Sequence, residues 1–571
     1  MTRACGASNV TGPLPKWQLA LAVATPVALG FGYMYYKNNR KPSSKPSRGK
    51  PKNSSKENGA PTSDKQISID VDCPPTKIIS EPETSLEKAQ RYKNEGNDHF
   101  KMGKFDEAIA QYNIAIEVCP KENEEALATF YQNRAAAYEQ LKKYSAVKAD
   151  CTKAIELKPR YAKALHRRAR VFELCNKLEA ALEDLTTARI SKSFSDESTI
   201  TMSDRILNQL SRQNAIEYLA NKTLIMPSQF FIKTYIAGFP SDPVFSMLKE
   251  TDYSNISPGF AKVLQCVKEE RYDDVIPLCT EEINSSEPDT LPDKMKVLLL
   301  RATFYLLLGH GAAIEDLGTI IDSDTASKSI KANALIKRAS LFMQSENPDK
   351  SFCDFETAVE LDPDCCDIYQ CRGQVNLLMD KVNEAREDFK KAFELNPFFK
   401  VAYVQKCYAD YRYGLAKGDE ELITEGIKNC KKAFKKFPDC PECYILYAQI
   451  LSEMRNYEKA DIYFAKACEK DPHNATVYVH RGLLQLQGYG DVEKAIEYIN
   501  KALEIDDKCE SAYETLGLIE VQRGNFTEAI KLFDKALPLG RTVVELTHIF
   551  SLQNAVKIQY TVRDRLDSEQ L

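Results

Sequence analysis

The sequence lacks the residue patterns on which enzyme catalysis usually depends. Only 6 of its 571 residues are histidine, and none of them stands in the HExxH spacing of a zinc hydrolase. It contains no glycine-rich loop that could cradle a phosphate and no nucleophile elbow. We therefore predict that the protein is not an enzyme, and we expect no catalytic residue, no bound metal and no cofactor.

An excess of one charge is also missing. The 77 lysines and arginines are balanced by 82 aspartates and glutamates, which gives a net charge of -5, and like charges form no block beyond the N-terminal region. Overall charge therefore gives no case for nucleic-acid binding. The 17 cysteines stand at irregular spacings, which is typical of free buried thiols in a reducing compartment. Cys440 and Cys443 have CxxC spacing without a second Cys or His pair nearby, so we expect no zinc site there.

One long uncharged run stands near the N-terminus. Residues 17–36 carry no charge, and their 20 residues at about 1.5 Å each reach roughly 30 Å, the thickness of a bilayer's hydrocarbon core. Only two basic residues precede this run, whereas eight follow it by residue 56. The positive-inside bias then leaves the large C-terminal part in the cytosol. We predict a transmembrane signal anchor at 17–36, behind a short N-terminal segment at 1–16.

A cleaved signal peptide is the competing interpretation of this run. Ala22-Val23-Ala24 resembles a cleavage site, but the apolar run is longer than a typical signal-peptide core and continues past that point. The next residues, 37–84, are rich in Lys, Pro, Ser and Asn and have almost nothing to bury. We predict that 37–84 form a disordered basic linker.

Beyond residue 85 the chain repeats itself. A small residue recurs at the second-helix anchor position of a 34-residue helix-turn-helix unit. The anchors are Ala115, Ala154, Ala188, Ala358, Ala392, Ala433, Ala467, Ala502 and Ala536, and a large residue stands three positions earlier at Phe355, Phe389, Phe464 and Phe533. Such units cannot bury their apolar faces alone, so they stack into a superhelix. We predict an all-α superhelical solenoid of about eleven helix-turn-helix units, whose spacing resembles that of tetratricopeptide repeats.

A break divides the repeats into two arrays. Residues 193–257 lack the repeat spacing and contain three prolines, so we expect a connector there. Three repeats precede it, at 85–192, and eight follow it, at 258–571. The second array is rich in tyrosines that we interpret mainly as repeat core, namely Tyr403, Tyr408, Tyr411, Tyr444, Tyr447 and Tyr478.

Five polar residues of the first array occupy equivalent helix positions. The first helix of each repeat lines the concave face of a solenoid, and residues four apart on it share a face. These positions hold Lys93, Asn97, Asn133, Lys163 and Arg167, and no acidic residue stands at a corresponding position. Because two cations four apart destabilise a helix by a few tenths of a kcal/mol, we predict that an anionic ligand completes this groove.

The third of these helices carries further basic side chains. His166, Arg168 and Arg170 point elsewhere on the helical wheel. We interpret them mainly as solvated surface, with Arg168 or Arg170 as candidate rim contacts.

The five groove residues resemble the two-carboxylate clamp of tetratricopeptide (TPR) domains. That clamp holds the C-terminal Glu-Glu-Val-Asp of cytosolic Hsp70 and Hsp90, and all five positions match it by residue type. The layout of anchor, basic linker, three repeats, connector and eight repeats resembles the 70-kilodalton TPR class of import receptors of the mitochondrial outer membrane. The sequence LIMPSQFFIKTY at 224–235 belongs to this resemblance.

The resemblance implies a single-pass receptor of the mitochondrial outer membrane with its bulk in the cytosol. It implies that Hsp70 and Hsp90 deliver preproteins, notably multispanning carriers with internal signals. The C-terminal groove would receive them and pass them to the outer-membrane translocase, whose subunits are implied partners. The sequence assigns no residue to preprotein contact.

Two alternatives remain open from the residues alone. A lumenal TPR co-chaperone of the secretory pathway would expose glycosylation sequons, which occur at Asn221, Asn255, Asn284, Asn474 and Asn525. A TPR chaperone receptor of the endoplasmic-reticulum membrane would share every physical feature described above. Only the resemblance favours mitochondria.

Overall fold

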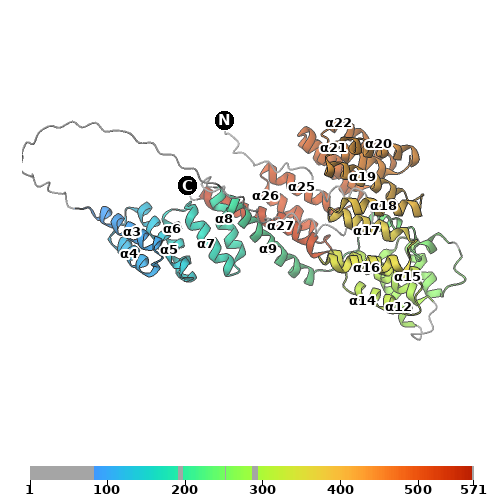
Figure 1. Ribbon diagram of the computed structural model, residues 1–571, viewed down its shortest axis with the longest axis horizontal. Helices are drawn as coiled ribbons and strands as arrows, with labels where there is room; N and C mark the ends of the chain where they lie inside the picture. Colours follow the sequence, from blue (N-terminus) through green and yellow to red (C-terminus); the bar gives the residue numbers. More distant parts are fainter. Residues whose placement is uncertain (1–82, 191–196, 251, 286–292, 569–571) are drawn as a thin grey trace, which may run out of the picture. The chain divides into compact units, whose positions relative to one another are not determined.

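The computed structural model describes residues 83–190, 197–250, 252–285 and 293–568, and every regular element in these ranges is a helix (Figure 1). The predicted membrane anchor and basic linker lie outside these residues. Within the described ranges, none of the helices is both long and apolar enough to cross a bilayer. The chain divides between residues 203 and 204 into two compact units, which we name the N-terminal unit and the C-terminal unit.

The N-terminal unit consists of three helix pairs that pack in sequence order (Figure 1). A capping box starts the first helix, because the Thr84 side chain accepts from the Glu87 backbone while the Glu87 carboxylate accepts from the Thr84 backbone. The helices are α3 (Ser85–Lys101), α4 (Phe105–Val118), α5 (Glu124–Gln140), α6 (Tyr144–Leu157), α7 (Ala162–Leu174) and α8 (Leu178–Ile190).

The C-terminal unit contains eight further helix pairs. Two helices outside the repeat pattern precede them, α9 (Glu197–Asn221), which crosses the division between the units, and α10 (Gln229–Ala237). The pairs are α11 (Pro258–Lys268) and α12 (Val275–Ser285), α13 (Lys294–Leu308) and α14 (Ala313–Asp322), α15 (Lys328–Gln344) and α16 (Pro348–Leu361), α17 (Cys366–Leu378) and α18 (Val382–Leu395), α19 (Lys400–Lys417) and α20 (Glu420–Lys436), α21 (Pro441–Glu453) and α22 (Tyr457–Lys470), α23 (Ala475–Leu484) and α24 (Val492–Ile505), and α25 (Glu510–Arg523) and α26 (Phe526–Ala536). Two short 3₁₀ helices, η1 (Ser246–Lys249) and η2 (Tyr272–Asp274), lie between α-helices, and a π-helical turn, η3 (Gln485–Tyr489), directly follows α23. The helix α27 (Val543–Ser568) follows the last pair. The predicted repeat solenoid is confirmed.

The predicted anchor residues form the inside of the repeats. All nine anchor alanines are buried, with no more than 2% of their surface exposed. The aromatic ring of the second helix packs against a glycine of the first: a Cβ on Gly373 would lie 2.8 Å from the Phe389 ring, and one on Gly517 would lie 2.7 Å from the Phe533 ring. Because real Cβ atoms do not approach that closely, glycine is required at both positions for the helices to pack at this distance.

An ion pair that we did not predict recurs inside five repeats. An arginine on the first helix holds an aspartate on the second with its guanidinium fork, at 2.6 or 2.7 Å for the shortest contact. The pairs are Arg134–Asp150, Arg168–Asp184, Arg301–Asp316, Arg338–Asp354 and Arg372–Asp388. Such bidentate contacts fix the orientation of the two helices while satisfying largely buried charges.

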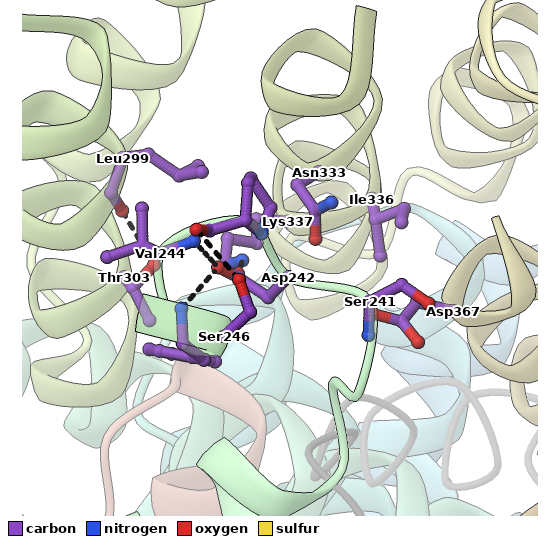
Figure 2. A network of polar contacts seen from close by, with 12 residues as sticks. Ser241, Asp242, Val244, Ser246, Leu299, Thr303, Asn333, Ile336, Lys337 and Asp367 are labelled. Atoms are coloured by element: carbon purple, nitrogen blue, oxygen red, sulfur yellow. Dashed lines mark hydrogen bonds and ion pairs between the residues drawn. The ribbon is translucent and has the colours of Figure 1, made fainter. Parts of the chain in front are cut away.

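The stretch that we expected to be a connector is built into the C-terminal unit from residue 204 onward. The buried Asp242 carboxylate accepts from Lys337 Nζ on α15 at 2.5 Å and from the backbone N–H of Val244 at 2.8 Å (Figure 2). It also accepts from the backbone N–H of Phe245 at 3.0 Å. The neighbouring backbone N–H of Ser241 donates to Asp367 at 3.0 Å. Residues 241–245 therefore attach the end of α10 to the repeats through buried polar groups, and we name this contact the buried latch.

The buried latch predicts that breaking its ion pair destabilises the protein more than breaking an exposed ion pair does. Lys337 and Asp242 are 0% and 1% exposed, so Lys337→Met would leave a buried carboxylate without its counter-charge. We expect this variant to destabilise the C-terminal unit by about 3–5 kcal/mol, measured by urea unfolding of the full chain. Lys531→Met, which breaks an exposed ion pair with Glu528, serves as the matched control and should leave the midpoint unchanged. Equal effects of the two substitutions would contradict this role of the latch.

Candidate functional site

Two of the predicted groove residues meet directly in the N-terminal unit. The helix α5 contacts both α3 and α7, and Asn133 Nδ2 on α5 donates to Asn97 Oδ1 on α3 at 3.1 Å. The Tyr112 hydroxyl donates to the same oxygen at 2.8 Å, and burial raises the pKa of Tyr112 to about 12, so the hydroxyl stays protonated. Because its oxygen is engaged twice, Asn97 is oriented with its amide N–H groups available to a ligand.

Arg167 reaches the same helix from α7. Its Nη1 donates to the backbone oxygen of Gln132 at 3.3 Å, one residue before Asn133. Its side chain is only 15% exposed. The structure therefore brings Arg167 to the α5 segment that also carries the asparagine contact.

The two lysines lie one helical turn from these residues. Lys93 precedes Asn97 by four positions on α3, and Lys163 precedes Arg167 by four positions on α7. Lys93 is half-buried and Lys163 is exposed. Among the residues that the structure describes, neither ammonium group pairs with a carboxylate. We name the set Lys93, Asn97, Asn133, Lys163 and Arg167 the clamp groove.

The clamp groove also contains the carboxylate of Glu139, which does not stand at one of the equivalent helix positions compared in the sequence. Arg167 Nε donates to Glu139 Oε2 at 2.8 Å, and Arg170 Nη2 lies 2.9 Å from Glu139 Oε1. Glu139 stands six residues beyond Asn133 on α5, so the four-residue spacing that identified the groove does not include it. The cationic character of Arg167 is thus partly neutralised by the protein itself.

The interpretation of Arg168 as solvated surface is wrong. Its side chain is 16% exposed and forms a bidentate contact with Asp184 on α8, at 2.8 and 2.7 Å. It is one of the recurring ion pairs within repeats, whose spacing of 15 or 16 residues was a signal available in the sequence. Arg170 is 45% exposed, which agrees with a surface position, and His166 is half-buried.

The tyrosines of the second array are repeat core, as predicted. Tyr408, Tyr411, Tyr447 and Tyr478 are at most 6% exposed, and Tyr403 and Tyr444 pack partly buried against the same core. Cys440 and Cys443 are also buried, and every cysteine in the described ranges is a free thiol. The described ranges contain no cluster of three or more potential metal ligands.

The C-terminal unit has a cavity that sequence reasoning did not find. Its volume is about 190 Å³, and we name it the α10 pocket. One wall is apolar and comes from α10 and the segment before it; its residues are Ile225, Met226, Pro227, Phe230 and Phe231. The pocket is also lined by Glu510 and Glu514 of α25, by Glu545 and His548 of α27, and by the basic residues Lys508 and Arg541. A pocket lined by both apolar side chains and clustered carboxylates suits an apolar segment that carries a basic group.

Burial and neighbouring negative charges disfavour the ionised forms of two carboxyl groups in the α10 pocket. Burial, together with the charges of Glu545 and Glu514, raises the pKa of Glu510 well above its usual value. Burial also raises the pKa of Glu514, against an opposing effect of His548. Glu545 is the best satisfied of the three, because it accepts from the backbone N–H groups of Arg541 and Thr542 at 2.7 and 3.2 Å.

Comparisons with known proteins extend over nearly the whole chain. Family models described as "Tetratricopeptide repeat" match residues 128–161, 441–474 and 490–542. The chain is 40% identical over 567 residues to the mitochondrial import receptor subunit TOM70 of Rattus norvegicus, covering 96% of this chain and 92% of the rat protein. It is 40% identical over 575 residues to the human TOM70, covering 96% and 93%. The crystal structure of yeast Tom70 is 25% identical, with a TM-score of 0.46 over 84% of this chain and 97% of that chain.

The raised pKa of Glu510 predicts a pH-dependent stability. The native state binds more protons than the unfolded state from about pH 4.5 up to the raised pKa, so native stability falls as pH rises across that window. Because the glutamine side chain of the Glu510→Gln variant cannot ionise, this residue no longer lowers the native stability as pH rises. We expect it to raise the thermal unfolding midpoint at pH 7.5 and to change it little at pH 4.5.

Calorimetry of the full chain at the two pH values measures this difference. Glu504→Gln, at an exposed position on the preceding helix α24, is the control for loss of one negative charge. An equal shift at both pH values for Glu510→Gln would contradict the assignment.

Proposed function

The chain belongs to the TOM70 family of mitochondrial import receptor subunits, and we propose that it is a non-catalytic receptor that docks the C-terminal tails of cytosolic Hsp70 and Hsp90. It then accepts the preproteins that these chaperones deliver. The observation that carries this proposal is that Asn97, Asn133 and Arg167, from the first helices of three successive repeats, meet along α5. Lys93 and Lys163 stand one helical turn before Asn97 and Arg167 on α3 and α7.

The clamp groove suits a peptide that ends in an acidic residue. A C-terminal aspartate carries two carboxylates, one on its side chain and one on its free terminus. Lys93 and the two asparagines offer donors from α3 and α5, while Lys163 and Arg167 offer donors from α7. Charge-assisted hydrogen bonds from both sides can therefore hold both carboxylates at once. An amidated or truncated tail would lose one of the two anchors.

The affinity expected from these contacts is moderate. Each charge-assisted hydrogen bond contributes roughly 1.5–3 kcal/mol, while association costs at least about 4 kcal/mol in lost translational and rotational freedom. A few such bonds give a dissociation constant on the order of micromolar. Weak docking fits a receptor that must release the chaperone after transfer.

We assign preprotein contact to the α10 pocket. Its apolar wall would take the hydrophobic face of a preprotein segment, and its carboxylates would take a basic side chain of the same segment. Multispanning carriers with internal signals are the proposed cargo, and the outer-membrane translocase is the proposed acceptor.

We also propose that residues 17–36 anchor the chain in the mitochondrial outer membrane, with both TPR arrays in the cytosol. One feature of the described residues disfavours the lumenal alternative. Asn474, one of the five sequon asparagines, is only 5% exposed, so the folded protein has no room for a glycan there.

Two variants separate the two binding activities. Arg167→Ala should abolish binding of a peptide ending in Glu-Glu-Val-Asp and keep the fold, because Glu139 still pairs with Arg170. Phe230→Ser should abolish binding of a carrier preprotein and keep peptide binding. Fluorescence anisotropy with the labelled peptide and pull-down of the translated preprotein measure the two outcomes.

The peptide affinity of the wild type should also fall as salt rises. Arg189→Ala, at an exposed position on α8, is the control for loss of one positive charge. Retained peptide binding by a folded Arg167→Ala protein would refute the clamp assignment.

The proposed anchor makes a separate prediction about location. Residues 1–60 fused to a fluorescent protein should direct it to the mitochondrial surface, where protease added to intact mitochondria degrades the reporter. The same fusion with Ala24→Arg and Ala28→Arg should stay in the cytosol, because charges at the centre of the run oppose insertion. A reporter on the endoplasmic reticulum, or one protected from protease, would contradict the proposed location.

A further inference from the structure

The clamp groove already holds a carboxylate of its own. Glu139 on α5 contacts Arg167 Nε at 2.8 Å through Oε2, and Arg170 approaches both of its oxygens, at 2.9 and 3.0 Å. The side chains of Glu139 and Arg167 are 18% and 15% exposed. This is the same kind of group, on the same arginine, that a docked acidic tail would present.

The Glu139 contact differs from the ion pairs that hold the repeats together. Arg168, the next residue on α7, grips Asp184 of its own repeat with two parallel hydrogen bonds, and that aspartate is only 2% exposed. Arg167 instead reaches back to the preceding repeat and gives Glu139 a single edge of its guanidinium. Glu139 is also shared with a second arginine. These features describe a contact inside the groove that is distinct from the packing within a repeat.

The charge of Glu139 opposes an incoming acidic tail in two ways. It occupies the Nε edge of Arg167, so a tail carboxylate can use only the remaining N–H groups of the fork. It also places a negative charge within reach of the tail's own carboxylates, in a partly buried groove where like charges repel more strongly than in water. Arg170 moderates both effects because it binds the same carboxylate.

We propose that Glu139 sets the strength of chaperone docking by competing with the tail carboxylate for Arg167. This inference rests on the proposed docking function and adds a determinant of its affinity. Glu139 is a positioning residue, since it acts on the ligand through Arg167. It keeps the guanidinium against α5 and at the same time holds the affinity below what the five clamp residues would reach without it.

The variant Glu139→Gln tests the proposal in the full chain. Glutamine retains an oxygen that can accept from Arg167 Nε but carries no charge. We expect it to bind a peptide ending in Glu-Glu-Val-Asp about fivefold more tightly than the wild type, with a steeper loss of affinity as salt rises. Glu179→Gln, at an exposed position on α8, changes the net charge equally and should leave the affinity unchanged. Unchanged or weaker binding by Glu139→Gln would overturn the proposal, as would an equal gain with Glu179→Gln.

A second pair of measurements separates this role from simple support of the fold. With an amidated peptide that ends in Asn in place of Asp, which lacks both carboxylates of the last residue, the gain from Glu139→Gln should shrink, whereas a general effect on folding would leave the gain unchanged and overturn the proposal. Glu139→Ala removes the acceptor as well as the charge, so it should bind the free-acid peptide less tightly than Glu139→Gln. Equal binding by the two variants would show that Glu139 does not position Arg167, which would also overturn the proposal.

The outcomes distinguish this inference from the docking function itself. If the wild type does not bind the peptide, or if Arg167→Ala still binds it, the docking function fails. If the wild type binds, Arg167→Ala does not, and Glu139→Gln gives no gain, only the role of Glu139 fails.

Discussion

The close contact between a glycine of one helix and an aromatic ring of the next sets the spacing of the repeats. In the N-terminal unit Gly96 makes room for Tyr112, and in the C-terminal unit Gly373 makes room for Phe389 and Gly517 for Phe533. Each ring is fully buried, so it can lie nowhere else without loss of the core. The pairs stack on one another, and in the N-terminal unit this stacking brings the first helix α5 into contact with both α3 and α7. The clamp groove depends on this stacking, because no single repeat carries enough donors to hold two carboxylates.

Neighbouring residues on α7 divide structural and binding roles. A helix turns about 100° per residue, so Arg168 faces its own second helix while Arg167 faces the preceding repeat. Arg168 forms a bidentate ion pair with Asp184. Arg167 keeps part of its fork available, and Glu139 limits how strongly that part can act. A binding site whose strength is moderated by its own carboxylate is consistent with a receptor that has to release its partner.

The α10 pocket shows the same balance between stability and binding. Burial, with repulsion between its carboxylates, raises the pKa of Glu510 and Glu514, which lowers the stability of the protein at neutral pH. Its apolar wall stays in place because the buried latch ties the end of α10 to α15 through Asp242 and Lys337. The C-terminal unit thus combines carboxyl groups that destabilise it at neutral pH with a helix, α10, that buried polar contacts hold in place.

The sequence by itself determined the helical solenoid and its number of repeats, and it singled out the five residues that we propose for the clamp, because these follow from fixed spacings along the chain. Alanine every 34 residues or so marks a helix pair wherever it occurs, and residues four apart share a helix face in any fold. Only the tertiary structure decided that Glu139 contacts Arg167, that Arg168 pairs with Asp184, and that residues 241–245 and α10 belong to the C-terminal unit. The Arg168–Asp184 pair does follow a spacing of 15 or 16 residues that recurs in five repeats, but the spacing alone does not show that the two helices bring the side chains together. The other contacts join positions with no common period, so their partners are set by how helices pack in space.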